Sequence, residues 1–166
     1  MTEVSINKTM HLSEHFTLGE VTKSKHAEVY NIPSHVAIEN LKRVCGWLEE
    51  LRFIYNTLYS LKPGEDYETS ENVEPIVINS GFRSPQLNKK VGGSPTSNHL
   101  TGCAVDIRVA GIEQALRYAV ILMDYADETK QDYDEILIEK NRYGAIWLHF
   151  AVRPEDNRRR TMFLQA

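Results

Sequence analysis

The ten-residue segment SNHLTGCAVD, residues 97–106, contains a histidine, a glycine and an aspartate. Residues 104–109, AVDIRV, are predicted to form a mostly apolar strand. A carboxylate such as that of Asp106 is costly to bury in a strand of this kind unless it is paired or bound to a metal ion. Gly102 permits a turn between the strand and His99, so we expect His99 to fold back beside Asp106.

A second histidine, His149, lies in the predicted strand 146–152. On its own, a histidine in a strand is more often a core residue bonded to a backbone carbonyl than a metal ligand. Together with His99 and Asp106, however, it supplies two imidazoles and one carboxylate. This set suits zinc with a fourth position left for water, as a catalytic zinc site requires. Zinc lowers the pKa of such a water toward ~7 and polarises a substrate carbonyl.

The elements that must position these residues follow from capping and hydrophobic patterns. Thr17 and Glu20 form a capping box that predicts a short helix from about residue 18, and Ser34 caps a long amphipathic helix to about Leu61. The polar, Pro- and Gly-containing stretches 62–74 and 84–99 are expected to be loops. The remaining predicted elements are a helix at about 112–123 and strands at 75–79, 104–109, 135–139 and 146–152.

Helices that precede strands predict an α+β fold, with a small antiparallel sheet that carries the site and packs against the N-terminal helices. The chain has 166 residues, which predicts a single domain over 1–166 with an N-terminal extension over 1–15. Hydrophobic residues make up 42% and charged residues 25%, which is typical of globular proteins and excludes disordered and fibrous classes.

Charge and hydropathy exclude several classes of partner. The net charge is −4, which gives no general attraction for nucleic acid. No apolar run approaches the ~20 residues that a membrane span needs, so no membrane insertion is expected. The start of the sequence lacks a basic segment followed by an apolar one, which predicts no secretory signal and a cytoplasmic product. Two cysteines provide no disulfide framework, and we expect a monomer.

The segment 97–106 resembles the signature S-x-H-x-x-G-x-A-x-D of the zinc D-Ala-D-Ala carboxypeptidase family, and WLH at 147–149 resembles its later histidine after an aromatic residue. The family's Hedgehog-type metallopeptidase fold also occurs in dipeptidases of vancomycin resistance and in phage endolysin peptidases. SGFRSPQLN at 80–88 and HFTLGE at 15–20 extend the resemblance to about residues 15–160. It implies one Zn²⁺ per chain, with three ligands: His99, Asp106 and His149.

Peptide hydrolysis at zinc also needs a general base, for which the sequence offers more than one candidate. Many relatives have a glutamate three residues before the last histidine, where this chain has Ile146. We therefore assign the base to Glu139 on the predicted strand 135–139, with Asp134 and Glu135 as lesser candidates.

The resemblance also gives roles to two residues outside that strand. It implies that Arg83 contacts substrate and stabilises the developing oxyanion, a task that suits a planar, permanently charged donor. Ser97 is a candidate to bind substrate or to support a metal ligand.

The resemblance predicts a zinc-dependent peptidase that cuts peptidoglycan stem peptides with a metal-activated water, acting at the cell wall. It leaves open a D-Ala-D-Ala carboxypeptidase and an endolysin-type endopeptidase. Because the glutamate before His149 is missing, an inactive zinc-binding or cell-wall-binding structural module remains the alternative.

Three other motifs are given structural interpretations. HLSEH at 11–15 fits another zinc-peptidase pattern, but that pattern needs a helix, and the capping box begins the helix after His15. Cys103 is expected to pack rather than to bind metal. The basic run 158–160 is expected at a solvated C-terminal strand edge, with weak attraction to anionic cell-wall polymer as the alternative.

Overall fold

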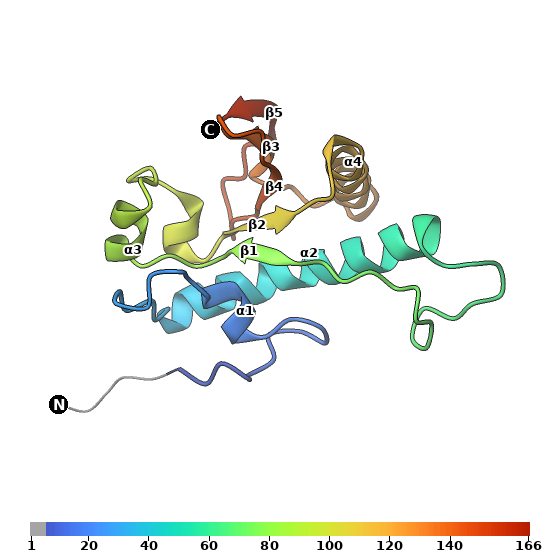
Figure 1. The fold of residues 1–166 in the computed structure, drawn as a ribbon, viewed down its shortest axis with the longest axis horizontal. Helices are drawn as coiled ribbons and strands as arrows, with labels where there is room; N and C mark the ends of the chain where they lie inside the picture. The colour runs from blue at the N-terminus through green and yellow to red at the C-terminus, as the bar shows by residue number, and fades with distance from the viewer. Residues whose placement is uncertain (1–5) are drawn as a thin grey trace.

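The computed structural model describes residues 6–166 and has a five-stranded sheet with helices against it (Figure 1). In chain order, the elements are α1 (Leu18–Thr22), α2 (His35–Tyr59), β1 (Ile78–Ser80), α3 (Pro85–Lys90), the 3₁₀ helix η1 (Asn98–Thr101), β2 (Ala104–Arg108), α4 (Ile112–Thr129), β3 (Glu135–Lys140), β4 (Ile146–Ala151) and β5 (Arg160–Gln165). The predicted α+β class is confirmed, as are the capping box of α1 and the Ser34 cap of α2.

The strands follow the order β1-β2-β4-β3-β5. The pairs β1–β2, β2–β4 and β4–β3 are antiparallel, as the sequence predicts. β5 pairs in parallel with β3, so the complete sheet is mixed. No separate strand was predicted for residues 160–165, although the basic run 158–160 was expected at a solvated strand edge.

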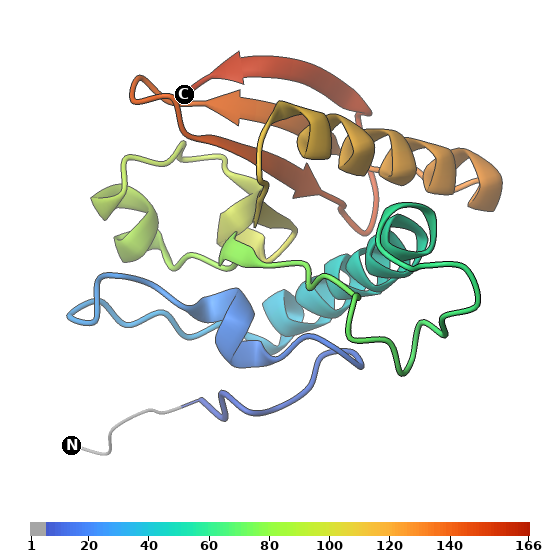
Figure 2. The same ribbon diagram turned by 45° about the vertical axis from the view of Figure 1, so that its right-hand side comes forward.

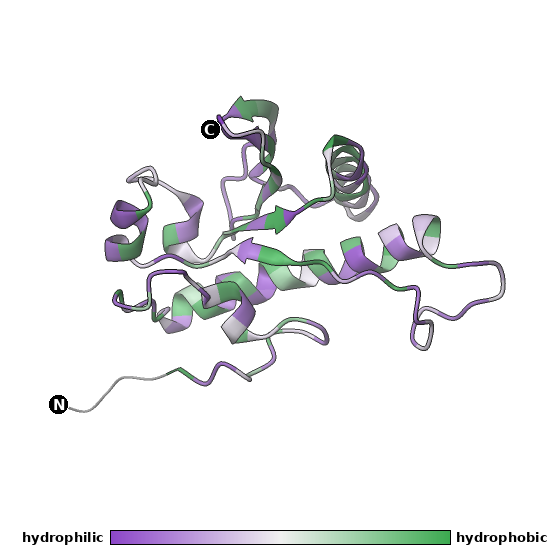
Figure 3. Ribbon diagram, viewed as in Figure 1, coloured by the Kyte–Doolittle hydropathy of each residue, from purple (hydrophilic) through white to green (hydrophobic). Residues whose placement is uncertain are grey.

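One face of the sheet is apolar and forms the core. It includes Val105, Ile107, Leu148 and Phe150, which pack with residues of α2 and α4. The ring centroids of Trp47 on α2 and Phe150 on β4 lie 5.5 Å apart. α4 runs alongside the β3–β4 part of the sheet (Figure 2), and apolar positions recur along α2 and the central strands (Figure 3). The opposite face is therefore free to carry polar side chains.

Two predicted boundaries differ from the structure. The stretch 84–99 contains α3 and η1 rather than one irregular loop. Ser84 caps α3 and Pro85 fixes its first turn, but six residues are too few to produce a helical hydrophobic pattern. β1 begins at Ile78 instead of Pro75, which has no N–H to donate to the ladder. The stretch 62–74 has neither helix nor strand, as predicted.

The N-terminal extension is described from Ile6 onward. There the backbone N–H of Leu18 donates to the Met10 carbonyl, and Leu12 is buried in the core. The N-terminal segment that was expected to lack a secretory signal begins with residues 1–5. These five residues lie outside the described part of the chain. Within residues 6–166, no helix is long and apolar enough to cross a membrane.

Candidate metal centre

His99 is fixed by the turn that encloses it. The Ser97 hydroxyl caps η1 by accepting the backbone N–H of His99, at 3.2 Å. Gly102 ends η1 with φ of 75°, and a Cβ there would lie 2.5 Å from the carbonyl oxygen of Ala37. The buried His99 ring donates from Nδ1 to the Gly81 carbonyl, at 2.7 Å. This bond leaves Nε2 as the nitrogen with a free lone pair.

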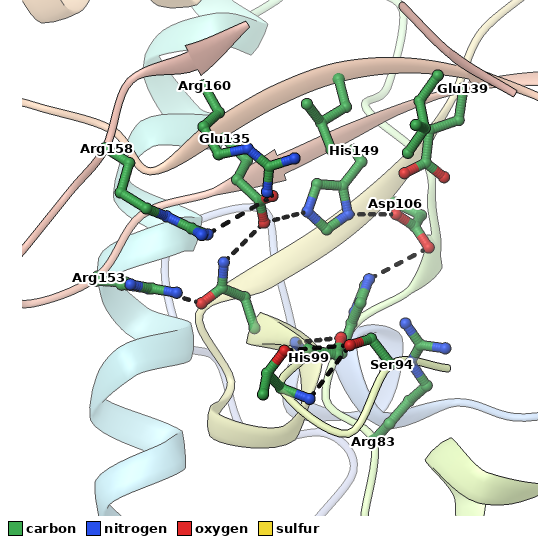
Figure 4. A pocket seen from close by; sticks show the side chains of 15 residues that line it. Arg83, Ser94, His99, Asp106, Glu135, Glu139, His149, Arg153, Arg158 and Arg160 are labelled. Carbon is green, nitrogen blue, oxygen red and sulfur yellow. Dashed lines mark hydrogen bonds and ion pairs between the residues drawn. The ribbon is translucent and has the colours of Figure 1, made fainter. Parts of the chain in front are cut away.

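Nε2 of His99 points to the strand carboxylate, as the glycine turn predicts. It lies 3.3 Å from Oδ2 of Asp106. Asp106 on β2 is paired in register with His149 on β4, so the two side chains share the polar face. Nδ1 of His149 lies 3.0 Å from Oδ1 of Asp106. One ligand atom from each of the three residues lies within 4.8 Å of the others (Figure 4).

A second carboxylate orients the His149 ring from its other side. Oε1 of Glu135 on β3 lies 3.2 Å from Nε2 of His149. The same carboxylate accepts hydrogen bonds from Nδ2 of Asn98, at 2.8 Å, and from Nη1 of Arg160, at 2.7 Å. A hydrogen bond from Nε2 to Glu135 keeps the proton on Nε2 when the ring is neutral, which leaves Nδ1 free to bind a metal ion.

The electrostatics of the triad match a cation site. Burial lowers the pKa of His149, but the hydrogen bonds to Asp106 and Glu135 outweigh it and raise this pKa to about 10. Burial opposes ionisation of Asp106, but the two imidazoles hold its pKa well below the usual range. The metal-free site therefore holds a proton where a metal ion could bind, and metal affinity must fall in acid.

These residues fit zinc. Two imidazole nitrogens and a carboxylate oxygen are ligand types that zinc takes, and one such atom from each residue lies within 4.8 Å of the others. With a metal ion bound, each imidazole would face it with an unprotonated nitrogen, because the other nitrogen has an acceptor in the protein, the Gly81 carbonyl for His99 and Glu135 for His149. Cys103 is buried and is not part of the cluster, in keeping with a packing role.

The triad lies in a cleft of about 340 Å³ that Arg83, Ser97 and Glu139 also line. Glu139 is on the polar face of β3, one strand from His149. Burial, and next the charge of Asp106, raise the pKa of Glu139. Glu139 forms no ion pair with a basic residue in the described chain.

Arg83 lies between β1 and α3, and its guanidinium points into the cleft near Asp106 and Glu139 (Figure 4). Its Nε is buried without a hydrogen-bond partner among residues 6–166. Burial lowers its pKa, against the opposing charges of Asp106 and Glu139. A guanidinium that lines the cleft beside a candidate metal centre can bind an anionic or carbonyl oxygen.

The two lesser candidates for the base have other partners. Asp134 is fully buried and binds Arg158 through both oxygens, at 3.0 and 2.7 Å. The carboxylate of Glu135 is held by Asn98, His149 and Arg160.

Apart from Arg83, the sequence did not indicate the arginines of the cleft. Arg153, Arg158 and Arg160 line it, whereas the basic run 158–160 was interpreted as a solvated edge. Within the run 158–160, Arg159 points away from the cleft and forms ion pairs with Asp127 and Asp132. The alternation of side chains along a strand could have separated Arg159 from its neighbours, but β5 itself was not predicted.

The HLSEH pattern does not form a metal site. Residues 11–15 precede α1 and are not helical, as expected. His15 Nδ1 lies 2.6 Å from Glu49 of α2, so this histidine anchors the N-terminal segment.

The fold and site define an α+β domain with a candidate His–Asp–His metal centre in a cleft. A family model described as Peptidase M15 matches residues 65–126, which include Arg83, Ser97, His99 and Asp106. The match covers less than half of the chain and supports the resemblance to the D-Ala-D-Ala metallopeptidases. Glu139 and His149 lie beyond the matched segment. No curated protein matches the chain.

Proposed function

We propose that this chain is a zinc-dependent peptidase that hydrolyses peptide bonds in peptidoglycan stem peptides. The observation that carries the proposal is the geometry of His99, Asp106 and His149, whose ligand atoms lie within 4.8 Å of one another in a cleft. These three residues would hold one zinc ion per chain. When bound there, zinc polarises a carbonyl and makes a water more acidic.

Glu139 is the general base in this proposal. A base needs a carboxylate that faces the reacting water and is not neutralised by an ion pair. Glu139 meets both conditions, since it lines the cleft and has no basic partner in the described chain. Its raised pKa suits a group that must accept a proton and then return it to the leaving amine. Asp134 and Glu135 are less suitable because hydrogen bonds occupy them.

Arg83 binds substrate and stabilises the oxyanion that forms at the attacked carbonyl. Its backbone N–H donates to the carbonyl of His99, at 3.0 Å, so its position is tied to the candidate ligand turn. Its guanidinium points into the cleft, and a planar, charged donor of this kind suits such a charge. Ser97 supports His99 through the cap of η1 while it also lines the cleft.

The peptidoglycan stem peptide is the substrate class implied by the family resemblance, and both a carboxypeptidase and an endopeptidase fit it. Incubation of the zinc-loaded protein with defined muropeptides, followed by mass spectrometry of the products, tests the activity. Loss of a terminal D-Ala identifies a carboxypeptidase, and an internal cut identifies an endopeptidase. Intact muropeptides together with stoichiometric zinc would contradict the enzymatic function and favour a zinc-binding structural module.

A further inference from the structure

The cleft has a basic end that the proposed chemistry does not use. Arg153 follows β4, Arg158 lies in the loop after it, and Arg160 begins β5. All three line the cleft of the candidate metal centre. Figure 4 shows them on the side of His149 opposite Glu139. We refer to these three residues as the arginine cluster.

One edge of each guanidinium is fixed by the protein. Arg158 donates from Nε and Nη2 to Asp134, and Arg160 donates from Nη1 to Glu135. Arg153 donates from Nε to Oδ1 of Asn98, at 2.8 Å. These bonds orient the planar groups without using all of their donors, so the cost of ordering them is met before a ligand arrives.

Other donors remain open to the cleft. Within residues 6–166, both terminal nitrogens of Arg153 and Nη1 of Arg158 have no hydrogen-bond partner, and Nη2 of Arg160 reaches only the sulfur of Met162, at 4.0 Å. The side chains are 29%, 44% and 39% exposed, so water now solvates these groups. A ligand in the cleft can replace that water.

The charges at this end do not balance. Three guanidinium groups face two carboxylates, those of Asp134 and Glu135. At Arg159, in the same run, carboxylates outnumber guanidinium groups, because this single guanidinium binds both Asp127 and Asp132 away from the cleft. The surplus positive charge therefore lies at this end of the cleft. Planar guanidinium groups recognise carboxylates through paired hydrogen bonds.

We propose that the arginine cluster is a subsite for a free carboxylate of the peptide substrate, close to the scissile bond. This rests on the proposed peptidase function and narrows its substrate class to anionic peptides. The subsite is close to the candidate metal centre because Glu135 joins them, with one oxygen 3.2 Å from His149 and the other 2.7 Å from Arg160. A C-terminal carboxylate or the α-carboxylate of a γ-linked D-glutamate supplies the same chemistry.

Two pairs of peptides test the subsite and separate these sources. The first pair is diacetyl-L-Lys-D-Ala-D-Ala and its C-terminal amide. The second is L-Ala-γ-D-Glu-L-Lys with the glutamate α-carboxylate free or amidated. For the pair that is cleaved, we expect the zinc-loaded protein to prefer the acid by about 10–100-fold in kcat/KM, the effect of a charge-assisted bidentate contact.

Arg153→Gln is the main variant, because Arg153 contacts none of the three candidate ligands. It should bring the acid down to the rate of the amide and leave the amide rate and zinc content unchanged. Arg159→Gln is the matched control and should keep the preference. Equal cleavage of acid and amide by the wild-type protein, or an equal loss on both with Arg153→Gln, would overturn the subsite.

Binding measurements separate this subsite from the peptidase function. Calorimetric titration of the same peptides into zinc-free protein should show tighter binding of the acid, abolished in Arg153→Gln and kept in Arg159→Gln. If no peptide is cleaved but this difference is present, the peptidase proposal fails and the subsite stands. If cleavage occurs and neither kcat/KM nor binding differs between acid and amide, the subsite alone fails.

Discussion

Glu135 and Glu139 are four residues apart on β3 and share the polar face of the sheet, yet their surroundings differ completely. Glu135 is held by Asn98, His149 and Arg160, and its side chain is 10% exposed. Glu139 faces the cleft with no basic partner in the described chain. A carboxylate held by several hydrogen bonds and ion pairs can orient a neighbour, and one without a basic partner can accept a proton. The contrast is the physical basis for the different tasks that we propose for the two ends of the cleft.

The largest effect is expected from removal of a candidate ligand that lies between these two ends. His149→Ala and Asp106→Ala should each lose stoichiometric zinc and muropeptide hydrolysis, because two remaining ligands hold the ion poorly. Elemental analysis and product mass measure the two losses. His15→Ala is the matched control, since His15 also binds a carboxylate but lies outside the site. Full zinc content in both site variants would disprove the ligand assignment.

Glu139→Gln keeps the shape of the side chain and removes the proton acceptor. Turnover of a cleaved muropeptide should fall by about 10²–10⁴-fold, the usual contribution of a general base, while zinc content is retained. Elemental analysis and steady-state rates on one preparation check both results. Wild-type rates in this variant would move the base to another residue and remove the proposed difference between the two ends of β3.

Arg83→Gln tests the proposed oxyanion donor, which lies at the same end of the cleft as Glu139. Loss of an oxyanion donor should lower kcat by about 10²–10³-fold without loss of zinc. Arg108→Gln is a suitable control, because Arg108 is an exposed arginine on the neighbouring strand β2. An unchanged kcat in Arg83→Gln would exclude Arg83 from the reaction.

Glu135→Gln should lower the zinc affinity of the site instead of impairing proton transfer. The amide can still contact Nε2 of His149, but it lacks the charge that raises the basicity of the ring, so zinc affinity should fall by about 10–100-fold. Competition with a zinc chelator measures the affinity. At saturating zinc, most of the turnover should return, in contrast to Glu139→Gln. A low rate that zinc does not restore would give Glu135 a direct part in the reaction.

The sequence predicted the parts of the site that depend on local patterns. Asp106 and His149 stand in apolar strands where alternation sets their faces, and Gly102 marks the turn that carries His99. The hairpin of β3 and β4 follows from the short link between them, and it places Glu139 on the face of His149. Each of these inferences needs only neighbours in sequence or a single strand pairing.

The partners of Glu135 could not be predicted in this way. Arg160 reaches it because β5 lies in parallel beside β3, and Asn98 reaches it from η1, 37 residues earlier in the chain. Such contacts depend on the order of strands in the sheet, which hydrophobic periodicity does not encode. The same reason explains why the basic run 158–160 was interpreted as solvated although Arg158 and Arg160 line the cleft.

The smallest expected effect is on stability, where the two glutamates should respond with opposite sign. Burial and the charge of Asp106 raise the pKa of Glu139 in the folded state. Between its unfolded and folded pKa values the folded state binds more protons, so stability falls as the pH rises through this window. Burial opposes ionisation of Glu135 as well, but its bonds to His149, Asn98 and Arg160 outweigh this effect and lower its pKa. Its contribution is present above the unfolded pKa and is lost in acid.

Thermal unfolding of zinc-free protein measures this difference, since bound zinc would offset the charge of Asp106. At pH 7, Glu139→Gln should have a slightly higher Tm than the wild-type protein, because the cost of the buried charge is removed. Glu135→Gln should have a lower Tm. The difference for Glu139→Gln should shrink as the pH falls from the raised folded pKa of Glu139 to its unfolded value of about 4. The difference for Glu135→Gln should persist to that pH and shrink only on further acidification, through the lowered folded pKa of Glu135. A Tm that falls by the same amount in both variants at pH 7 would mean that Glu139 is as well satisfied as Glu135, and would remove the physical basis for its role as the base.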